Sequence, residues 1–352
     1  MSEQFLWELA KKENIFWTSA AGDAADVVLS TRVRLARNYK EYLFPHKIGD
    51  QQRDELIAAI QAVIVKDPDL YYFDLRLLPE DLRIALFEKQ LISKELAVKS
   101  GQAALIINKN NDLSIMINEE DHLRIQAYES GLAFKAALEK AVRYDEIFAT
   151  ASSYAFDNEL GFHTSCPSNF GTGMRASVMV HLPALVETGA LKQMTKDMHK
   201  AGYVVRGMYG ESTESWGGFF QISNQLTTGL SEEEIIQRLS VAMENLARQE
   251  RAQRRAILEK KRIFFEDHVY RAYGLLRHAR RISHKEAVLN LSLVRAAVNE
   301  QIIPDITLEE VNKLIFISNP YHIKALHKDI DEQTISQKRA EMIRARLADP
   351  VE

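Results

Sequence analysis

The sequence predicts an α+β fold, in which an antiparallel sheet is flanked by helices and a C-terminal all-helical domain follows. Residues 103–108 and 113–118 are apolar runs on either side of Asn110-Asn111-Asp112, which is the pattern of a β-hairpin. Residues 175–182 alternate between apolar and polar side chains with the period of a strand. After residue 230 the strand patterns stop and helix-capping sequences take their place.

The remaining elements follow from the same signals. Residues 51–66 carry apolar side chains at helical spacing, and Pro79 suits the first turn of a second helix. Short β-prone runs at 203–206 and 219–223 predict two further strands. Three Ser/Thr-x-x-Glu boxes begin helices at Ser231, Ser283 and Thr307.

Length and composition limit the classes of protein. The chain has 352 residues, 46% of them hydrophobic, and we assign residues 1–255 to a mixed domain and 256–352 to a helical one. A net charge of −4 gives no general attraction to nucleic acid or membranes, and no apolar stretch is long enough to span a bilayer. The single cysteine, Cys166, favours a reducing compartment. Without a secretory signal at the N-terminus, we expect a cytoplasmic protein.

Two arginines in the segment Ser30–Asn38 are two residues apart. On a strand, Arg32 and Arg34 would share one face, where two planar guanidinium groups can bind the oxygens of a phosphate. A solvated basic edge strand is the alternative.

Acidic residues dominate the segment from Asn118 to Arg124. Asn118 suits a helix cap and the following acids suit a first helical turn, which predicts the start of a helix. Arg124 would be unfavourable near the positive end of that helix unless it binds an anion.

The cysteine lies in an unusual setting. Cys166 is surrounded by polar residues, and a Gly171-Thr172-Gly173 turn follows it, where backbone amides are accessible. Such surroundings favour a thiolate, although a lone cysteine is more often a small buried apolar residue. Arg175 adds a cation at the start of the next strand.

A glycine-rich segment follows the strand at 203–206. Arg206 and Gly207 lead into Gly210 and Glu211, and loops of this composition often cover sites. A plain solvent loop would explain the glycines but not Arg206. The chain has no phosphate-binding P-loop, no protein-kinase signature and no zinc-ligand set, so we predict no resident metal site.

Together these segments resemble the phosphagen (guanidino) kinase superfamily and, within it, the bacterial protein-arginine kinases. The resemblance covers residues 18–250 and includes five motifs in the family's order. They are Ser-x-Arg-Val-Arg at 30–34, Asn-Glu-Glu-Asp-His-Leu-Arg at 118–124, Cys-Pro-Ser-Asn-x-Gly-Thr-Gly at 166–173, Arg-Ala-Ser-Val-Met at 175–179 and Arg-Gly-x-x-Gly-Glu at 206–211.

The resemblance implies the catalytic-domain fold of phosphagen kinases, ATP as phosphoryl donor and Mg²⁺ as its ion. It assigns nucleotide binding to Ser30, Arg32, Arg34, Gln90, Arg124, Arg175, Ala176, Ser177, Val178, Met179, Arg206, Gly207 and Gly210. It assigns the acceptor guanidinium to the carboxylates of Glu120 and Glu211 and to the thiolate of Cys166. Phosphoryl transfer needs alignment and charge stabilisation, which these groups would supply.

The resemblance also implies which acceptor is used. Kinases of free metabolites in this superfamily carry an N-terminal helical domain, for which this sequence has no room, so we expect an arginine side chain in a protein as acceptor. The helical C-terminal domain would bind substrate proteins and phosphoarginine and contribute to a homodimer. A zinc-binding activator protein and an AAA+ unfoldase–protease that degrades the marked proteins are the implied partners.

Three positions depart from the family pattern. Gln90 replaces a nucleotide-contacting histidine, and Phe170 replaces a smaller aliphatic residue. Of the phosphoarginine-sensing motif only Arg339 and Ala340 remain, so activation by phosphoarginine is in question.

Three other functions compete with a protein-arginine kinase. One is a kinase for free arginine or another small guanidine. The second is a catalytically silent adaptor that recognises phosphoarginine. The third, a nucleic-acid-binding module, fits poorly because the arginines are scattered among acids.

Overall fold

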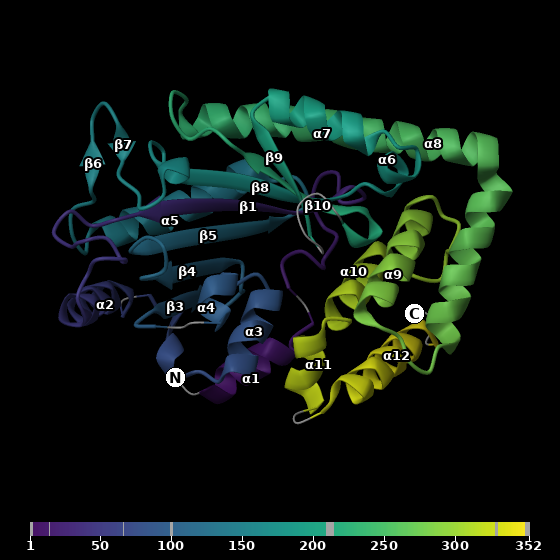
Figure 1. Cartoon of the computed structure of the whole chain (residues 1–352), viewed down its shortest axis with the longest axis horizontal. Helices are drawn as coiled ribbons and strands as arrows, with labels where there is room; N and C mark the ends of the chain where they lie inside the picture. Colours follow the sequence, from purple (N-terminus) through teal and green to yellow (C-terminus); the bar gives the residue numbers. More distant parts are fainter. Residues whose placement is uncertain are drawn as a thin grey trace.

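The computed structural model describes residues 3–13, 15–65, 67–98, 101–208, 215–327 and 330–348. Its centre is an antiparallel sheet, as predicted, and the sheet has eight strands in the order β2-β3-β4-β5-β1-β8-β10-β9 (Figure 1). Its strands are β1 (Val28–Arg37), β2 (Leu70–Asp74), β3 (Ala104–Asn108), β4 (Leu113–Ile117), β5 (Leu123–Ser130), β8 (Met174–His181), β9 (Tyr203–Gly207) and β10 (Phe219–Asn224). A separate hairpin pairs β6 (Phe156–Asp157) with β7 (Gly161–Phe162).

Helices flank the sheet and then form the C-terminal part alone. The earlier helices are α1 (Glu3–Lys11), α2 (Asp50–Ile64), α3 (Glu80–Glu88), α4 (Lys94–Val98), α5 (Phe134–Ala149), α6 (Pro183–Glu187) and α7 (Leu191–Lys200), with the 3-10 turns η1 (Leu75–Leu77), η2 (Pro167–Asn169) and η3 (Trp216–Gly218). The later ones are α8 (Glu232–His278), α9 (His284–Asn299), α10 (Leu308–Ile317), α11 (Pro320–His327) and α12 (Glu332–Ala348). Within the described ranges, no helix is long and apolar enough to cross a bilayer.

The two faces of the sheet differ because side chains alternate along each strand. On one face, Val33 of β1, Ile125 of β5 and Val178 of β8 are fully or almost fully buried. They share a hydrophobic core with α5 and the first half of α8. Removing this apolar surface from water stabilises the sheet and fixes its register, since a one-residue shift would reverse the two faces.

The opposite face, which carries the arginines of β1, is covered from two sides. Helices α1, α3 and α4 pack over the outer strands through a core that includes Leu105 and Met116. The helical domain packs over the other end of the sheet through a core that includes Met179 and Phe219. The middle of this face therefore lies between the two sets of helices.

Helix α8 connects the two parts of the chain. It runs along the sheet domain and bends at Lys261, whose backbone leaves helical geometry, before it enters the helical domain (Figure 1). The predicted boundary between residues 255 and 256 falls inside this helix, shortly before the bend, and stays a prediction. The three predicted caps are confirmed: the hydroxyls of Ser231, Ser283 and Thr307 each accept a backbone N–H three residues ahead.

The prediction of a helix beginning at Asn118 is wrong. Residues 118–122 form the short connection between β4 and β5, with Asn118 in the left-handed region at φ 56°. Pairing of Ile117 with Leu123 closes this connection, and the side chain of Asn38 accepts the N–H of His122. Strand pairing across the sheet overrides the local helical preference, so Arg124 lies on β5.

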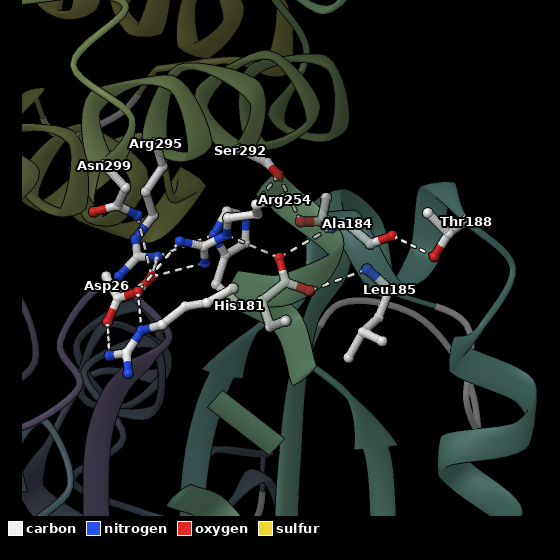
Figure 2. Close-up of polar contacts among 12 residues, drawn as sticks. Asp26, His181, Ala184, Leu185, Thr188, Arg254, Ser292, Arg295 and Asn299 are labelled. Carbon is white, nitrogen blue, oxygen red and sulfur yellow. Dashed lines mark hydrogen bonds and ion pairs between the residues drawn. The ribbon is translucent and has the colours of Figure 1, made fainter. Parts of the chain in front are cut away.

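A buried polar network joins the sheet domain to α8 and α9 (Figure 2). Arg295 of α9 is fully buried and donates to the carbonyls of Ala25 and Asp26 at 2.8 and 2.9 Å. Arg254 of α8 reaches the carboxylate of Asp26 at 3.3 Å, and Arg295 also contacts His181 Nδ1 at 3.0 Å. Burial, followed by the charge of Arg254, lowers the pKa of Arg295 to about 9.

A second contact between the domains involves the end of α3. The carboxylate of Glu88 accepts the N–H groups of Tyr321 and His322 in the first turn of α11, at 3.1 and 2.9 Å. Burial raises the pKa of Glu88 to about 8, although these two N–H donors oppose the shift. The folded state therefore binds this proton more tightly than the unfolded state does, so protonation of Glu88 stabilises the fold. This stabilisation depends on pH between the unfolded pKa of about 4.5 and the folded pKa of about 8.

This shift predicts a pH-dependent stability. The contribution of Glu88 is fully present below about pH 4.5 and is lost as the pH rises towards 8. Relative to Glu88→Gln, which cannot ionise, the wild-type free energy of unfolding should fall by about 3 kcal/mol between pH 5.5 and 8.5. Denaturant titrations at both pH values measure it. Glu80→Gln, at the exposed start of α3, should leave the wild-type profile unchanged; a pH-independent difference for Glu88→Gln would contradict the assignment.

Candidate active site

Arginines from three adjacent strands meet on the open face of the sheet. Arg34 of β1 lies directly opposite Arg175 of β8 and Gln126 of β5. Arg32 lies two residues before Arg34, and Arg124 lies two before Gln126, so all share this face. The predicted pairing of Arg32 and Arg34 on one face of a strand is therefore confirmed, and the strand is central and not an edge.

The charges of this cluster repel one another. Burial, followed by the charges of Arg124, Arg32 and Arg175, holds the pKa of Arg34 well below its usual value. Burial and the charge of Arg206 lower the pKa of Arg175 to about 10. Among the described residues, no partner accepts a hydrogen bond from the buried Nε of Arg34 or of Arg124. Such a cluster favours a ligand that brings several negative charges, such as a triphosphate.

A cavity of about 450 Å³ opens beside the cluster, which is a suitable size for a nucleotide-sized ligand. Residues of the sheet domain that line it include Arg32, Arg34, Gln90, Arg124, Gln126, Met179, Gly207 and Gln221. Gln90 directly follows the last turn of α3, with a left-handed backbone at φ 64°, and its carbonyl accepts a hydrogen bond from the Tyr128 hydroxyl. That contact fixes the position of Gln90 in the cavity wall.

Of the other predicted nucleotide-binding residues that the structure describes, some lie beside this cavity and others lie on the opposite face of the sheet or outside the cavity lining. Ser177 lies beside the cluster, where its hydroxyl accepts from Arg32 Nε at 3.3 Å. Arg206, which is exposed on β9, lies opposite the cavity residue Gln221. The side chains of Ala176 and Val178 lie on the other face, in the hydrophobic core, because alternate residues of β8 point away from the arginines. Ser30 is buried in β1, outside the cavity lining, and Gly210 lies outside the described residues.

Glu120, one of the predicted acceptor residues, lies beside the arginine cluster. Glu120 forms an ion pair with Arg124 at 3.1 Å and accepts a hydrogen bond from Asn169 Nδ2 at 3.4 Å. Asn169 in turn accepts from Arg34 Nη2 at 3.0 Å. Burial opposes ionisation of Glu119, which also pairs with Arg124, but the charge of Arg124 and the hydrogen bonds to this carboxylate together lower its pKa. Asn169 thus links the arginines to the carboxylate of Glu120.

The segment with the cysteine is fixed next to this carboxylate. The Sγ of Cys166 lies 3.0 Å from Ser168 Oγ. Asp121 accepts the backbone N–H of Ser165 and the side-chain amide of Asn38, each at 2.7 Å. Since Asp121 follows Glu120, these bonds hold the segment around Cys166 beside the β4–β5 connection, which carries Glu120. Glu211 lies outside the described residues.

Some residues of the site carried no separate signal in the sequence. Asn169 lies inside the motif at 166–173, but only the fold shows that its amide bridges Arg34 and Glu120. The sequence does not distinguish Glu119 from its acidic neighbours Glu120 and Asp121. His284 and Asn319 of the helical domain line the cavity as well, and nothing in their local sequence indicates it.

The two residues of the predicted phosphoarginine site are buried. Arg339 is 3% exposed and donates to the carbonyls of Ser318 and Ile282 at 2.6 and 2.9 Å. Ala340 is 1% exposed in the core of the helical domain. In this structure Arg339 therefore holds two segments of the helical domain together and does not face solvent.

The fold and the arrangement of the site, in which clustered arginines lie beside a carboxylate and a thiol, are those of a phosphoryl transferase of the guanidino kinase class. The family model of the ATP:guanido phosphotransferase C-terminal catalytic domain matches residues 52–253, and that of the protein-arginine kinase McsB C-terminal domain matches residues 262–351. The chain belongs to the McsB family of protein-arginine kinases.

Full-length relatives and solved structures agree with this membership. The chain is 41% identical over 340 residues to a protein-arginine kinase of Geobacillus stearothermophilus, covering 94% of this chain and 93% of the relative. It is 38% identical over 339 residues to that of Brevibacillus brevis, covering 94% of each. A duplicated taurocyamine kinase from Schistosoma mansoni matches with a TM-score of 0.58 and 27% identity over 68% of this chain and 35% of that one. A lombricine kinase, at 24% identity over 69% of this chain and 70% of its own, has the same TM-score and supports the fold.

Proposed function

We propose that this enzyme transfers the γ-phosphoryl group of ATP to arginine side chains of other proteins. One observation supports it above the others: a continuous set of contacts runs from Arg34 through Asn169 to Glu120. The phosphate-binding cluster and the acceptor carboxylate are therefore parts of one rigid arrangement. An aligned donor and acceptor supply much of the catalysis in phosphoryl transfer.

The arginines would bind the phosphates and stabilise the charge that spreads over the transferred group. Mg²⁺ would enter with the nucleotide, because the described residues contain no group of acidic or metal-binding side chains that could hold an ion alone. Bound to the phosphates, the ion would neutralise part of their charge. The only carboxylate lining the cavity, among the described residues, is Glu88, which accepts from the first turn of α11.

The acceptor must lose a proton, because a guanidinium ion has a pKa above about 12 and is a poor nucleophile. Glu120 would orient one guanidinium nitrogen and take its proton as the nitrogen–phosphorus bond forms and the bond to the ADP oxygen breaks. Glu211 would be the second carboxylate, and the thiolate of Cys166 would pair with the guanidinium and fix its plane. General-base assistance of this kind contributes roughly 10²–10⁴ in rate.

The choice of a protein acceptor is supported by the full-length relatives, which are protein-arginine kinases, and by the McsB-type helical domain at residues 262–351. By the same resemblance we propose that the product marks proteins for an AAA+ unfoldase–protease. A zinc-binding activator protein and a homodimer belong to the same proposal.

The test is the substitution Glu120→Gln. Incubation of the wild type with ATP, Mg²⁺ and casein should give acid-labile phosphate on arginine, identified by mass spectrometry. Loss of the base should lower the rate by about 10²-fold or more at unchanged fold. Glu146→Gln, on the exposed side of α5, is the matched control and should keep full activity.

The same assay distinguishes a protein acceptor from free arginine, the competing acceptor. Turnover of free arginine with no response to added protein would support a kinase of small guanidines. Absence of both reactions together with absence of ATP binding would overturn the proposal.

A further inference from the structure

We propose that both domains build the nucleotide site, with His284 and Asn319 of the helical domain forming the wall that contacts the nucleoside and Arg339 holding that wall in position. The inference rests on the proposed function, which assigns the cavity to ATP. It adds residues that lie outside the catalytic domain, and the two in the wall lie between 160 and 287 positions away from Arg32, Arg34 and Arg124 along the chain.

The cavity lies between the two domains. The arginines reach it from the sheet, whereas His284 at the start of α9 and Asn319 and Pro320 at the start of α11 line it from the helical domain. This follows from the packing, because the arginine face is covered at one end by α3 and at the other by the helical domain.

Apart from the arginines and Glu88, the side chains that line the cavity are uncharged or apolar and suit a base and ribose. If Arg32, Arg34 and Arg124 take the phosphates, the nucleoside must occupy the space lined by Phe87, Gln90 and the helical domain. Burial and the nearby charge of Arg339 lower the pKa of His284 to about 4, so its ring is neutral at pH 7. A neutral imidazole and an amide offer hydrogen-bonding groups that suit a base or ribose better than a phosphate.

Arg339 of α12 joins the two segments that supply these residues. Its guanidinium donates to the carbonyl of Ile282, two residues before His284, and to the carbonyl of Ser318, one residue before Asn319. Because one planar group makes both bonds, the distance between the two segments is fixed.

Glu88 holds the same wall from the other domain. Its carboxylate accepts the N–H groups of Tyr321 and His322 at 3.1 and 2.9 Å, which anchors the start of α11 beside Asn319. Glu88 itself lines the cavity. The wall is therefore bonded to the catalytic domain at the point where the nucleoside would lie, and bound ATP would contact both domains at once.

Two probes distinguish a nucleoside contact from a phosphate contact: ATP and inorganic tripolyphosphate, each titrated by calorimetry into the full-length protein. Asn319→Ser and His284→Ala should weaken ATP binding about 5–20-fold and leave tripolyphosphate binding unchanged. Asn290→Ala, at a half-buried position of α9, and His278→Ala, at the exposed end of α8, should leave both affinities unchanged.

Arg339→Met and Arg339→Lys test the positioning role in steady-state assays. The methionine variant should raise KM for ATP about 5-fold or more, with KM for the acceptor protein unchanged. The lysine variant should recover part of the loss, because an ammonium group can still donate to one carbonyl at a time. A general structural defect would instead alter both KM values.

Arg34→Ala separates failure of this inference from failure of the proposed function. If the wild type binds neither probe, the assignment of the cavity to ATP is wrong. If Arg34→Ala weakens both probes but Asn319→Ser and His284→Ala match their controls, only the shared wall is wrong. Equal weakening of ATP and tripolyphosphate by the wall variants would also overturn it.

Discussion

Arg34→Ala is expected to lower kcat/KM for phosphorylation about 10²–10³-fold while leaving the protein folded. Arg34 lies at the centre of the cluster, opposite Arg175, and its Nη2 donates to Asn169 at 3.0 Å. Removing it eliminates a charge that would stabilise the transferred group and also the support of Asn169 beside Glu120. Loss of one preorganised group of this kind costs about 3–4 kcal/mol of transition-state stabilisation. Initial rates over a range of ATP concentrations measure it.

Stability provides an independent readout of the same variant. The pKa of Arg34 is held down by burial and by Arg124, Arg32 and Arg175, so the folded state bears the cost of keeping these charges together. Loss of the charge should therefore leave the midpoint of thermal unfolding unchanged or raise it. Active sites commonly trade stability for activity in this way.

Arg34→Lys and Arg143→Ala complete the series. Lysine keeps the charge but loses the planar fork, and we expect activity between that of the wild type and Arg34→Ala. Arg143 is exposed on α5, on the other side of the sheet, and its replacement should leave kcat/KM within about 2-fold of wild type. Similar activities for Arg34→Ala and Arg143→Ala would show that the arginine cluster takes no part in the reaction.

The parts of the site that depend on local periodicity could be predicted from the sequence. Period-two alternation determines that Arg32 and Arg34 share a face, and this holds wherever the strand lies in the sheet. The hairpin at 103–118 and the caps at Ser231, Ser283 and Thr307 are also local, and the structure contains all of them.

Features determined by distant contacts could not be predicted in this way. Asn118 and the acids after it have the composition of a helix start, but pairing of Ile117 with Leu123 converts them into a strand connection. Nothing near Asn319 indicates a ligand, because its role depends on α11 packing against Glu88. The family resemblance predicts phosphoarginine binding at Arg339, yet the donors of Arg339 are directed to interior carbonyls.

Arg295→Leu is expected to reduce the free energy of unfolding by about 3 kcal/mol. Arg295 is fully buried and donates to the carbonyls of Ala25 and Asp26, to Asn312 Oδ1 at 2.9 Å and to His181 Nδ1. Leucine fills the volume but leaves these buried acceptors without that donor, and each lost partner costs about 1 kcal/mol or more. The carboxylate of Asp26 keeps its ion pairs with Arg251 and Arg254, which limits the loss. Urea titration followed by circular dichroism measures it.

Arg295→Leu should also change the hydrogen bonds of His181 at the end of β8. A general weakening of the core would not produce this change. Since arginine can only donate, Nδ1 of His181 must be the acceptor and Nε2 must carry the proton that bonds Ser292 Oγ at 2.8 Å (Figure 2). Ser292 then donates to the carbonyl of Gly217 at 2.6 Å. Nitrogen-15 NMR of the histidine ring should show the Nε2–H tautomer in the wild type and a mixture in Arg295→Leu. Arg255→Leu, exposed on α8, should preserve both stability and tautomer; equal behaviour of the two variants would show that the network does not join the domains.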